Sequence, residues 1–179
     1  KHISINSKTI SRYLDYFEDA FMISKAQRYD IKGKSYIESP LKYYFADVGL
    51  RNARLNFRQQ EETHIMENVI YNELCLRGFD VDVGVVEYST KTIDGKTKRI
   101  QREVDFIANK GSNRYYIQSA FAIPDEEKRE QETKVFSKIA DSFKKIVVVR
   151  EDIIPWRDDR GILYIGVEQF LLNEESIDL

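Results

Sequence analysis

Two runs of alternating apolar and polar residues, joined by a short turn, constrain the fold of this chain more than any other feature. The runs are "REVDFIA" at 102–108 and "RYYIQSA" at 114–120, and "NKGSN" separates them. A period of two indicates strands with two different faces. Lys110-Gly111 is typical of a tight turn. The sequence therefore predicts a hairpin whose strands lie side by side in a sheet.

The elements around this hairpin predict an α/β protein. We expect a helix, three strands, a second helix, a strand, and a last strand with a short helix, at 61–77, 79–90, 99–108, 114–122, 125–142, 144–151 and 161–172. Gly78 is suited to end the first helix, and Asp94-Gly95 marks the turn between the first two strands. The order α-β-β-β-α-β predicts a mixed sheet flanked by helices.

The first third of the chain predicts a smaller unit. Residues 5–22 have apolar side chains at helical spacing. Residues 25–39 then alternate around Lys32-Gly33-Lys34, which favours a hairpin with a basic tip. A helix followed by such a hairpin indicates the end of a winged helix, and any small α+β connector would give the same pattern. Pro40 and Gly49 indicate a linker over 39–53, whose aromatic residues we expect to be buried between two units.

Charge supports a division of the chain into residues 1–55 and 56–179. The 28 basic and 30 acidic side chains nearly cancel. Residues 1–60 nevertheless carry a net charge of +5, and residues 61–179 a net charge of −7. The first unit is therefore better suited to a polyanion such as DNA. The phosphate contacts that we expect there are Lys8, Arg12, Lys32 and Lys34.

Several classes of protein are disfavoured by what the sequence contains. Cys75 is the single cysteine, so an internal disulfide is excluded, and a cytoplasmic location is expected. No apolar run approaches the roughly 20 residues of a membrane span, so we expect no membrane partner. The sequence has no phosphate-binding loop of the G-x-x-x-x-G-K-[ST] type and no zinc spacing.

The order of elements is similar to the core of PD-(D/E)XK nucleases, which use a divalent metal. Hard carboxylate ligands must converge on Mg²⁺ from different elements. In that fold a Glu comes from the first helix, an Asp from the second strand and a Glu-X-Lys from the third. Here Glu67 and Asp105 match the first two positions, whereas Gln118 and Ala120 stand at the Glu and Lys positions. We expect a degenerate site, without bound metal and without catalytic activity.

Two alternatives to this reading of the site remain open. A lysine on the following helix could replace the missing one, and the candidates are Lys128, Lys134 and Lys138. Alternatively, Glu103 and Asp105 share an exposed face, opposite Val104 and Phe106, and pair with Arg99, Arg102 or Arg114. If two carboxylates do face each other without a metal, one of their pKa values should be raised.

Four stretches in order resemble the C-terminal region of predicted bacterial and archaeal AAA-type ATPases. They are "SKTISRYLDYFEDAFMISKAQRYDIKGK", "SPLKYYFADVGLRNA", "HIMENVIYNELCLRGFDV" and "REVDFIANKGSNRYYIQSAFAIPDEEKREQE". The resemblance implies a partial winged helix followed by a restriction-endonuclease-like αβββαβ core with a mixed sheet. It also implies an ATPase lobe outside this chain, where ATP and Mg²⁺ would bind. This chain itself is expected to carry no cofactor.

The resemblance implies three functions that remain to be distinguished. The first is a non-catalytic or weakly active nuclease-like accessory module of an ATPase, which associates with DNA or positions and assembles the ATPase. The second is a protein-interaction platform without nucleic-acid binding, and the third is a Mg²⁺-dependent nuclease with a rearranged site. The expected partners are DNA, the protein's own ATPase lobe and further copies in a homo-oligomer.

Overall fold

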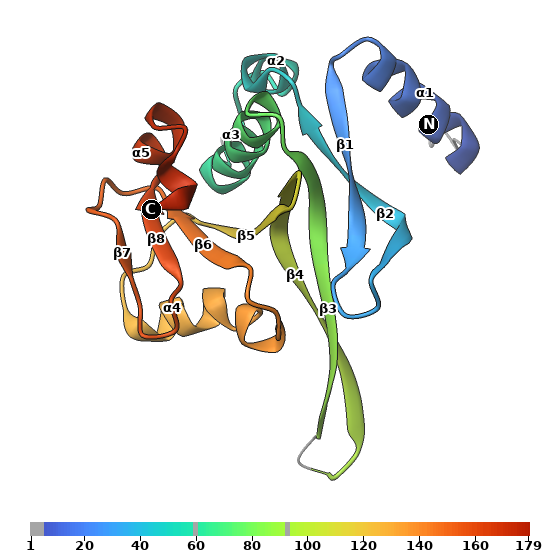
Figure 1. The fold of residues 1–179 in the computed structure, drawn as a ribbon. Coiled ribbons are helices and arrows are strands. Elements are labelled where there is room, and N and C mark those ends of the chain that lie inside the picture. Colours follow the sequence, from blue (N-terminus) through green and yellow to red (C-terminus); the bar gives the residue numbers. More distant parts are fainter. Residues whose placement is uncertain (1–5, 59–60, 92–93) are drawn as a thin grey trace.

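One eight-stranded mixed sheet organises the protein in the computed structural model, which describes residues 6–58, 61–91 and 94–179 (Figure 1). The strand order is β2-β1-β3-β4-β5-β6-β8-β7. The strands are β1 (Ile23–Asp30), β2 (Ser35–Phe45), β3 (Asp80–Lys91), β4 (Thr97–Lys110), β5 (Asn113–Ala120), β6 (Lys144–Val149), β7 (Trp156–Arg157) and β8 (Leu163–Gly166). The helices are α1 (Ser7–Asp19), α2 (Val48–Arg54), α3 (Glu62–Leu76), α4 (Glu126–Thr133) and α5 (Val167–Leu172), with 3-10 turns η1 (Phe136–Lys138) and η2 (Ser176–Asp178).

The predicted order α-β-β-β-α-β from residue 61 is confirmed as α3-β3-β4-β5-α4-β6. The strands β3, β4 and β5 form an antiparallel meander, whereas β5, β6 and β8 run parallel. A parallel pair needs a crossover connection, and α4 with η1 supplies it between β5 and β6. The prediction of a mixed sheet is therefore confirmed.

Each face of the sheet has its own hydrophobic core. On one face α3 and α5 pack through Ile70, Leu74 and Phe170. On the other face the segment that follows α4 packs through Val135 and Phe136. We refer to these as the α3 face and the α4 face. Because both faces are covered, the inner strands are apolar on both sides, as "KIVVV" in β6 illustrates.

The helix predicted over 125–142 is shorter than expected. It spans Glu126–Thr133 in α4, and a 3-10 turn follows. Val135, Phe136 and Ile139 are all buried against the sheet. We infer that the chain leaves the helical path because anchoring all three apolar groups contributes more than continuing a polar helix. The predicted charge pairs within the helix do form, for example Lys128–Glu132 at 2.7 Å.

The strands β1 and β2, which come from the first third of the chain, share the sheet with the later strands. The predicted basic hairpin is confirmed as β1–β2, and β1 pairs in parallel with β3 through Arg28, Tyr29 and Asp30. The helix predicted over 5–22 is α1, although residue 5 lies outside the described residues. None of the residues of α1 is buried.

The linker predicted over 39–53 is wrong, because β2 continues to Phe45 and α2 begins at Val48. Pro40 is tolerated within β2 at an interruption of the ladder, where the β1–β2 register shifts between Ala26 and Arg28. Proline lacks a ladder donor, so strands accept it at such irregularities. The Pro40 carbonyl accepts a hydrogen bond from Arg28 Nε at 2.7 Å.

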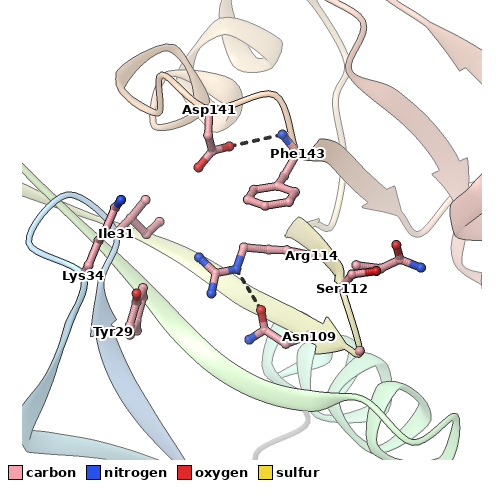
Figure 2. Close-up of a pocket in the computed structure, with 10 residues that line it drawn as sticks. Tyr29, Ile31, Lys34, Asn109, Ser112, Arg114, Asp141 and Phe143 are labelled. Atoms are coloured by element: carbon pink, nitrogen blue, oxygen red, sulfur yellow. Dashed lines mark hydrogen bonds between the residues drawn. The ribbon is translucent and has the colours of Figure 1, made fainter.

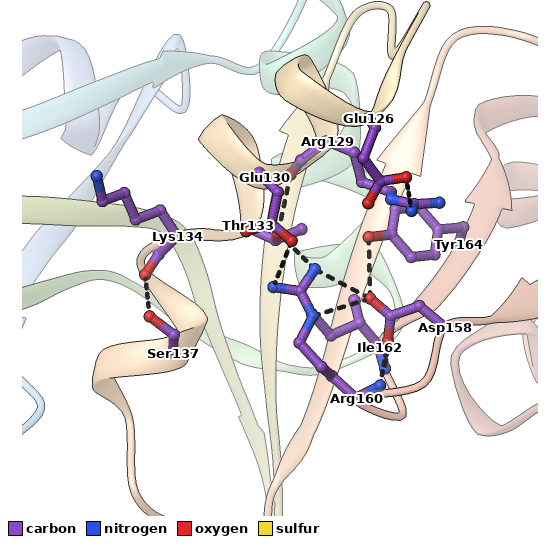
Figure 3. A network of polar contacts seen from close by, with 10 residues as sticks. All are labelled: Glu126, Arg129, Glu130, Thr133, Lys134, Ser137, Asp158, Arg160, Ile162 and Tyr164. Atoms are coloured by element: carbon purple, nitrogen blue, oxygen red, sulfur yellow. Dashed lines mark hydrogen bonds and ion pairs between the residues drawn. The ribbon is translucent and has the colours of Figure 1, made fainter.

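A polar network joins α4 to the loop before β8 (Figure 3). Its centre is Asp158, whose side chain is 4% exposed and pairs with Arg160 at 3.1 Å. The Asp158 carboxylate also accepts hydrogen bonds from the Ile162 N–H and the Tyr164 hydroxyl. Arg160 reaches the Thr133 hydroxyl on α4 at 3.0 Å. Asp158, Arg160 and Thr133 therefore bind one another across this contact, which indicates structural support for the crossover.

Among the residues that the structure describes, no helix combines the length and the apolar character needed to cross a membrane.

Candidate functional site

The candidate site lies where β2 meets α3, and Asn68 fixes this junction. Asn68 is 5% exposed. Its side chain accepts the Phe45 N–H at 2.9 Å and donates to the Phe45 carbonyl at 2.8 Å. These two bonds hold the end of β2 against the middle of α3. Lys42 and Tyr44 on β2 are thereby placed beside Glu67 on α3.

Glu67 is held by two groups from β2. The Tyr44 hydroxyl donates to Glu67 Oε1 at 2.7 Å, and the Lys42 ammonium forms an ion pair with the same oxygen. Tyr44 is 3% exposed, and its ring stacks on Tyr71 at 4.0 Å between centroids. Burial and the Glu67 charge raise the pKa of Tyr44 far above its usual range, so the hydroxyl remains a donor. Tyr44 thus confirms the expected burial of an aromatic residue from this segment.

A bulge in β4 brings Asp105 to the same side of the sheet. Val104 pairs with Gly84 and Ile107 pairs with Asp82, so β4 holds one residue more than β3 there. A Cβ on Gly84 would lie 3.0 Å from Val104 Cβ and 3.1 Å from Ile107 Cγ1. Glycine therefore allows β4 to close over this point, and bulges of this kind redirect side chains.

The expectation that Val104 and Phe106 share one face is wrong because of this bulge. Val104 belongs to the core of the α4 face and Phe106 to the core of the α3 face. The β4–β5 ladder begins only at the Phe106–Ile117 pair. Beyond it, Asp105 Oδ2 accepts the Ser119 N–H at 2.8 Å. A side chain thus takes the place of a backbone partner where the two strands separate.

The environment of Asp105 disfavours its charged form. Burial, followed by the negative charge of Glu67, raises the pKa of Asp105 to about 7. The Ser119 N–H and the Lys42 ammonium act in the opposite direction. The expectation that one of two facing carboxylates has a raised pKa is therefore confirmed, and Asp105 is the one affected.

Gln118 does not join Glu67 and Asp105. It pairs with Val147 on β6 and shares its face with Tyr116 and Ala120, which belong to the core of the α4 face. Glu67 enters from the α3 face. Within the described residues, Gln118 Oε1 is buried without a hydrogen-bond partner. The structure therefore brings together two of the three predicted site residues.

The cation beside the two carboxylates comes from a strand that sequence reasoning did not consider. Of the predicted lysines, Lys128 pairs with Glu132, and Lys138 lies over the Tyr88 ring at 5.3 Å. The Lys134 carbonyl accepts the Ser137 hydroxyl. Lys42 takes the role instead. Its position in "SPLKYYF" carried no motif, because only the β2–α3 contact brings it to Glu67.

The alternative that Glu103 and Asp105 pair with arginines of their own hairpin is also wrong. Glu103 pairs with Arg28 on β1 rather than with an arginine of its own hairpin. Arg114 donates from Nε to Asn109 Oδ1 at 2.8 Å. Asp105 is turned toward Ser119 and Glu67, as described above.

The residues present do not fit a Mg²⁺ site. Mg²⁺ favours near-octahedral oxygen coordination through carboxylates and water. Within the described part of the chain, no group of three or more His, Cys, Asp or Glu side chains could hold a metal ion. The two carboxylates of the site already share the Lys42 ammonium, and one of them has a pKa near 7. We therefore derive no metal-dependent chemistry from this site.

The four predicted phosphate contacts lie in two places. Lys8 and Arg12 are exposed on α1, whereas Lys32 and Lys34 are exposed at the turn between β1 and β2. Figure 1 shows α1 and this turn at opposite ends of β1. An eight-residue strand spans about 26 Å. The four side chains therefore do not form one compact site.

A second concavity surrounds Arg114, between the β1–β2 turn and the loop before β6 (Figure 2). Its volume is about 370 Å³. The Arg114 guanidinium lies 5.3 Å from the Tyr29 ring centroid and 5.6 Å from that of Phe143. Asp141 lines the same space. Positive and negative side chains therefore both line this pocket, and Arg114 already contacts Asn109 and two aromatic rings. The pocket favours no class of ligand.

Comparison with known proteins finds similarity to a domain family of unknown function and to uncharacterized proteins. A family model, Domain of unknown function (DUF8612), matches residues 1–61. An uncharacterized protein of Haemophilus influenzae is 35% identical over 173 residues, which cover 97% of this chain and 39% of that protein. The uncharacterized protein MJ1544 of Methanocaldococcus jannaschii is 32% identical over 172 residues, 96% of this chain and 34% of that protein.

The chain thus spans between a third and two fifths of the length of these relatives. No solved structure matches it.

Proposed function

We propose that this chain is a non-catalytic or weakly active nuclease-like accessory module of a AAA-type ATPase, which acts in DNA association or in positioning the ATPase. The observation that carries the proposal is the internal cation of the site. The Lys42 ammonium forms an ion pair with Glu67, the carboxylate that a divalent metal would need as a ligand. A site that already holds an internal counterion has less need of Mg²⁺.

The relation to PD-(D/E)XK nucleases is supported by topology. The order α3-β3-β4-β5-α4-β6 matches that core, and the sheet has the strand order β3-β4-β5-β6. Glu67 on the first helix and Asp105 on the second strand come together, as they do in such a core. The winged-helix assignment of the first unit rests on the sequence resemblance and on the sequence of α1 followed by the β1–β2 hairpin.

The size of the expected rate loss supports the absence of catalytic activity. Removing one group that stabilises charge in a transition state typically costs about 10²–10³ in rate. Here the Glu-X-Lys pair is replaced by Gln118 and Ala120, and Gln118 stands on the face opposite Glu67. Lys42 restores a positive charge, but not a third oxygen ligand.

The purified chain is expected to give no cleavage of single- or double-stranded DNA in Mg²⁺ or Mn²⁺. The Asp105→Ala variant should give the same background, because the substitution removes no ligand of a catalytic metal. The measurement is a time course on end-labelled and supercoiled DNA, with a chelator control for both proteins. Metal-dependent cleavage by the wild type that disappears in Asp105→Ala would refute the non-catalytic part of the proposal.

A protein-interaction platform is the second candidate, and α1 favours it. Its apolar side chains are largely exposed, with exposed fractions of 47% for Ile10, 56% for Tyr13 and 44% for Phe17. Exposed apolar patches frequently mark interaction sites. This candidate predicts no nucleic-acid binding, so the DNA titration described below also decides between the two.

A further inference from the structure

The β3–β4 hairpin extends beyond the body of the protein as a two-stranded arm (Figure 1). Val86 on β3 and Val104 on β4 are buried, whereas no described residue between them is buried. Five residue pairs, from Glu87–Gln101 to Lys91–Thr97, continue the ladder past this point. At about 3.4 Å per residue, the paired part of the arm projects about 17 Å. An arm this long is not needed to complete the core.

The arm carries a net positive charge in a unit that is acidic as a whole. Residues 87–103 contain five Lys or Arg and three Asp or Glu, a net charge of +2, although residues 61–179 carry −7. Lys91, Lys98, Arg99 and Arg102 are all exposed. Within the described part of the chain, none of these four forms an ion pair. Their charge is therefore available to a partner.

The basic side chains point to both faces of the ribbon. Lys98 pairs with Thr90, and Arg102 pairs with the buried Val86, so both lie on the α4 face. By strand alternation Lys91 and Arg99 lie on the opposite face. A ribbon that is charged on one face suits a flat anionic surface. Positive charge on both faces suits a groove with phosphates along both walls.

The base of the arm extends the positive surface toward the β1–β2 turn. The Lys32 ammonium donates to the Glu87 carbonyl at 3.1 Å and lies 6.0 Å from the Tyr88 ring centroid. Lys138 lies 5.3 Å from the same ring. Lys32 was predicted as a phosphate contact from sequence, and the fold places it beside the arm rather than beside Lys8 and Arg12.

We propose that the β3–β4 arm is a DNA-binding element that enters the major groove of duplex DNA and contacts the phosphates on both sides. The proposal rests on the DNA-association part of the function proposed above and names the surface that performs it. Two paired strands lie about 4.8 Å apart, and the major groove of B-form DNA is about 12 Å wide, which admits a two-stranded ribbon.

Duplex DNA fits this arm better than duplex RNA. The major groove of A-form RNA is too narrow and deep for side chains to read. Contacts to phosphates carry no sequence information and mainly position the protein. We therefore expect binding with weak sequence preference and a strong dependence on salt.

The test is a fluorescence-anisotropy titration of the full chain with a labelled DNA duplex at several salt concentrations. The double variant Lys98→Gln/Arg99→Gln is expected to bind about tenfold more weakly at physiological salt. The slope of log affinity against log salt should fall by about 1.8, because each lost phosphate contact contributes about 0.9. The comparison variant is Lys8→Gln/Arg12→Gln, which removes the same charge from the competing phosphate contacts predicted on α1; if the arm is the binding element, this variant loses less affinity than the arm variant.

Loss of binding in the arm variant alone, with unchanged thermal unfolding, supports the proposal. Equal losses in the two variants, or a loss in the α1 variant alone, overturn the arm and leave DNA association standing. Tighter binding to an RNA duplex than to DNA also overturns it. Failure of the wild type to bind DNA overturns both the arm and DNA association, while the absence of metal-dependent cleavage remains separately testable.

Discussion

Replacing Asn68 with leucine is expected to lower the free energy of unfolding by about 1–3 kcal/mol. Asn68 is buried and satisfies both the N–H and the carbonyl of Phe45. Leucine keeps the volume but leaves the Phe45 N–H without its partner, whereas the Phe45 carbonyl still accepts a hydrogen bond from Asn72. Each unsatisfied buried polar group costs about 1–3 kcal/mol. Because these bonds hold β2 on α3, the variant should also loosen Lys42 and Tyr44 from Glu67.

Urea unfolding followed by far-UV circular dichroism measures the loss for Asn68→Leu. The matched control is Asn72→Leu, one helical turn further along α3. Asn72 donates to the Phe45 and Ala46 carbonyls at 3.0 and 3.2 Å, and Phe45 retains its Asn68 partner in that variant. We expect the control to lose about 1 kcal/mol or less. Similar losses in both variants would mean that the Asn68 pair is not what fixes the junction.

Replacing Asp105 with asparagine is expected to stabilise the fold by about 1–3 kcal/mol at pH 8. The pKa of Asp105 is raised to about 7 from an ordinary value near 3.8, through burial and the Glu67 charge. Each unit of pKa shift corresponds to about 1.4 kcal/mol, so the shift sets an upper limit of about 4 kcal/mol. The expected gain is smaller because the asparagine amide brings into the site an additional N–H donor that a protonated carboxyl does not have. Asparagine removes the buried charge and keeps an oxygen that can accept the Ser119 N–H.

The sign of the pH dependence follows from linkage. Between about pH 4 and pH 7 the folded state holds a proton on Asp105 that the unfolded chain has released, so stability falls as the pH rises. Above about pH 8, where Asp105 is ionised in both the folded and the unfolded state, this contribution is constant. The advantage of Asp105→Asn should therefore be near zero at pH 4 and reach its maximum above pH 7.

Unfolding curves of both proteins from pH 4 to pH 8.5 measure this difference. Glu103→Gln serves as the control, since it removes a carboxylate from an exposed position of the same strand. It should show no growing advantage with pH. A constant difference between wild type and Asp105→Asn across the range would contradict a raised pKa at Asp105.

Local sequence patterns were sufficient to predict most of the elements. The alternation in 102–108 and 114–120 predicted β4 and β5, and the apolar run "KIVVV" predicted β6. The placement of Glu67 on a helix and Asp105 on a neighbouring strand followed from the same patterns. Contacts between segments far apart in the sequence were harder to predict. Pro40 and Gly49 suggested a linker, although a ladder irregularity accommodates Pro40 within β2.

The composition of the site depended on contacts that leave no local pattern. Lys42 is one of many lysines until Asn68 fixes β2 on α3. Gln118 was expected beside Asp105 because their strands are adjacent. The bulge opposite Gly84 shifts the alternation of β4 relative to β5, so adjacency did not translate into a shared face. The basic arm was hidden by the negative total charge of residues 61–179.

We propose that the Lys42 ammonium, rather than a divalent metal, serves as the counterion of Glu67 and Asp105 at this site. A calorimetric titration of the wild-type chain with Mn²⁺ at pH 8 tests it most directly, with Glu67→Gln as the reference. We predict no saturable binding at submillimolar Mn²⁺ and the same heats for both proteins. Stoichiometric binding of Mn²⁺ in the micromolar range that is lost in Glu67→Gln would contradict the claim.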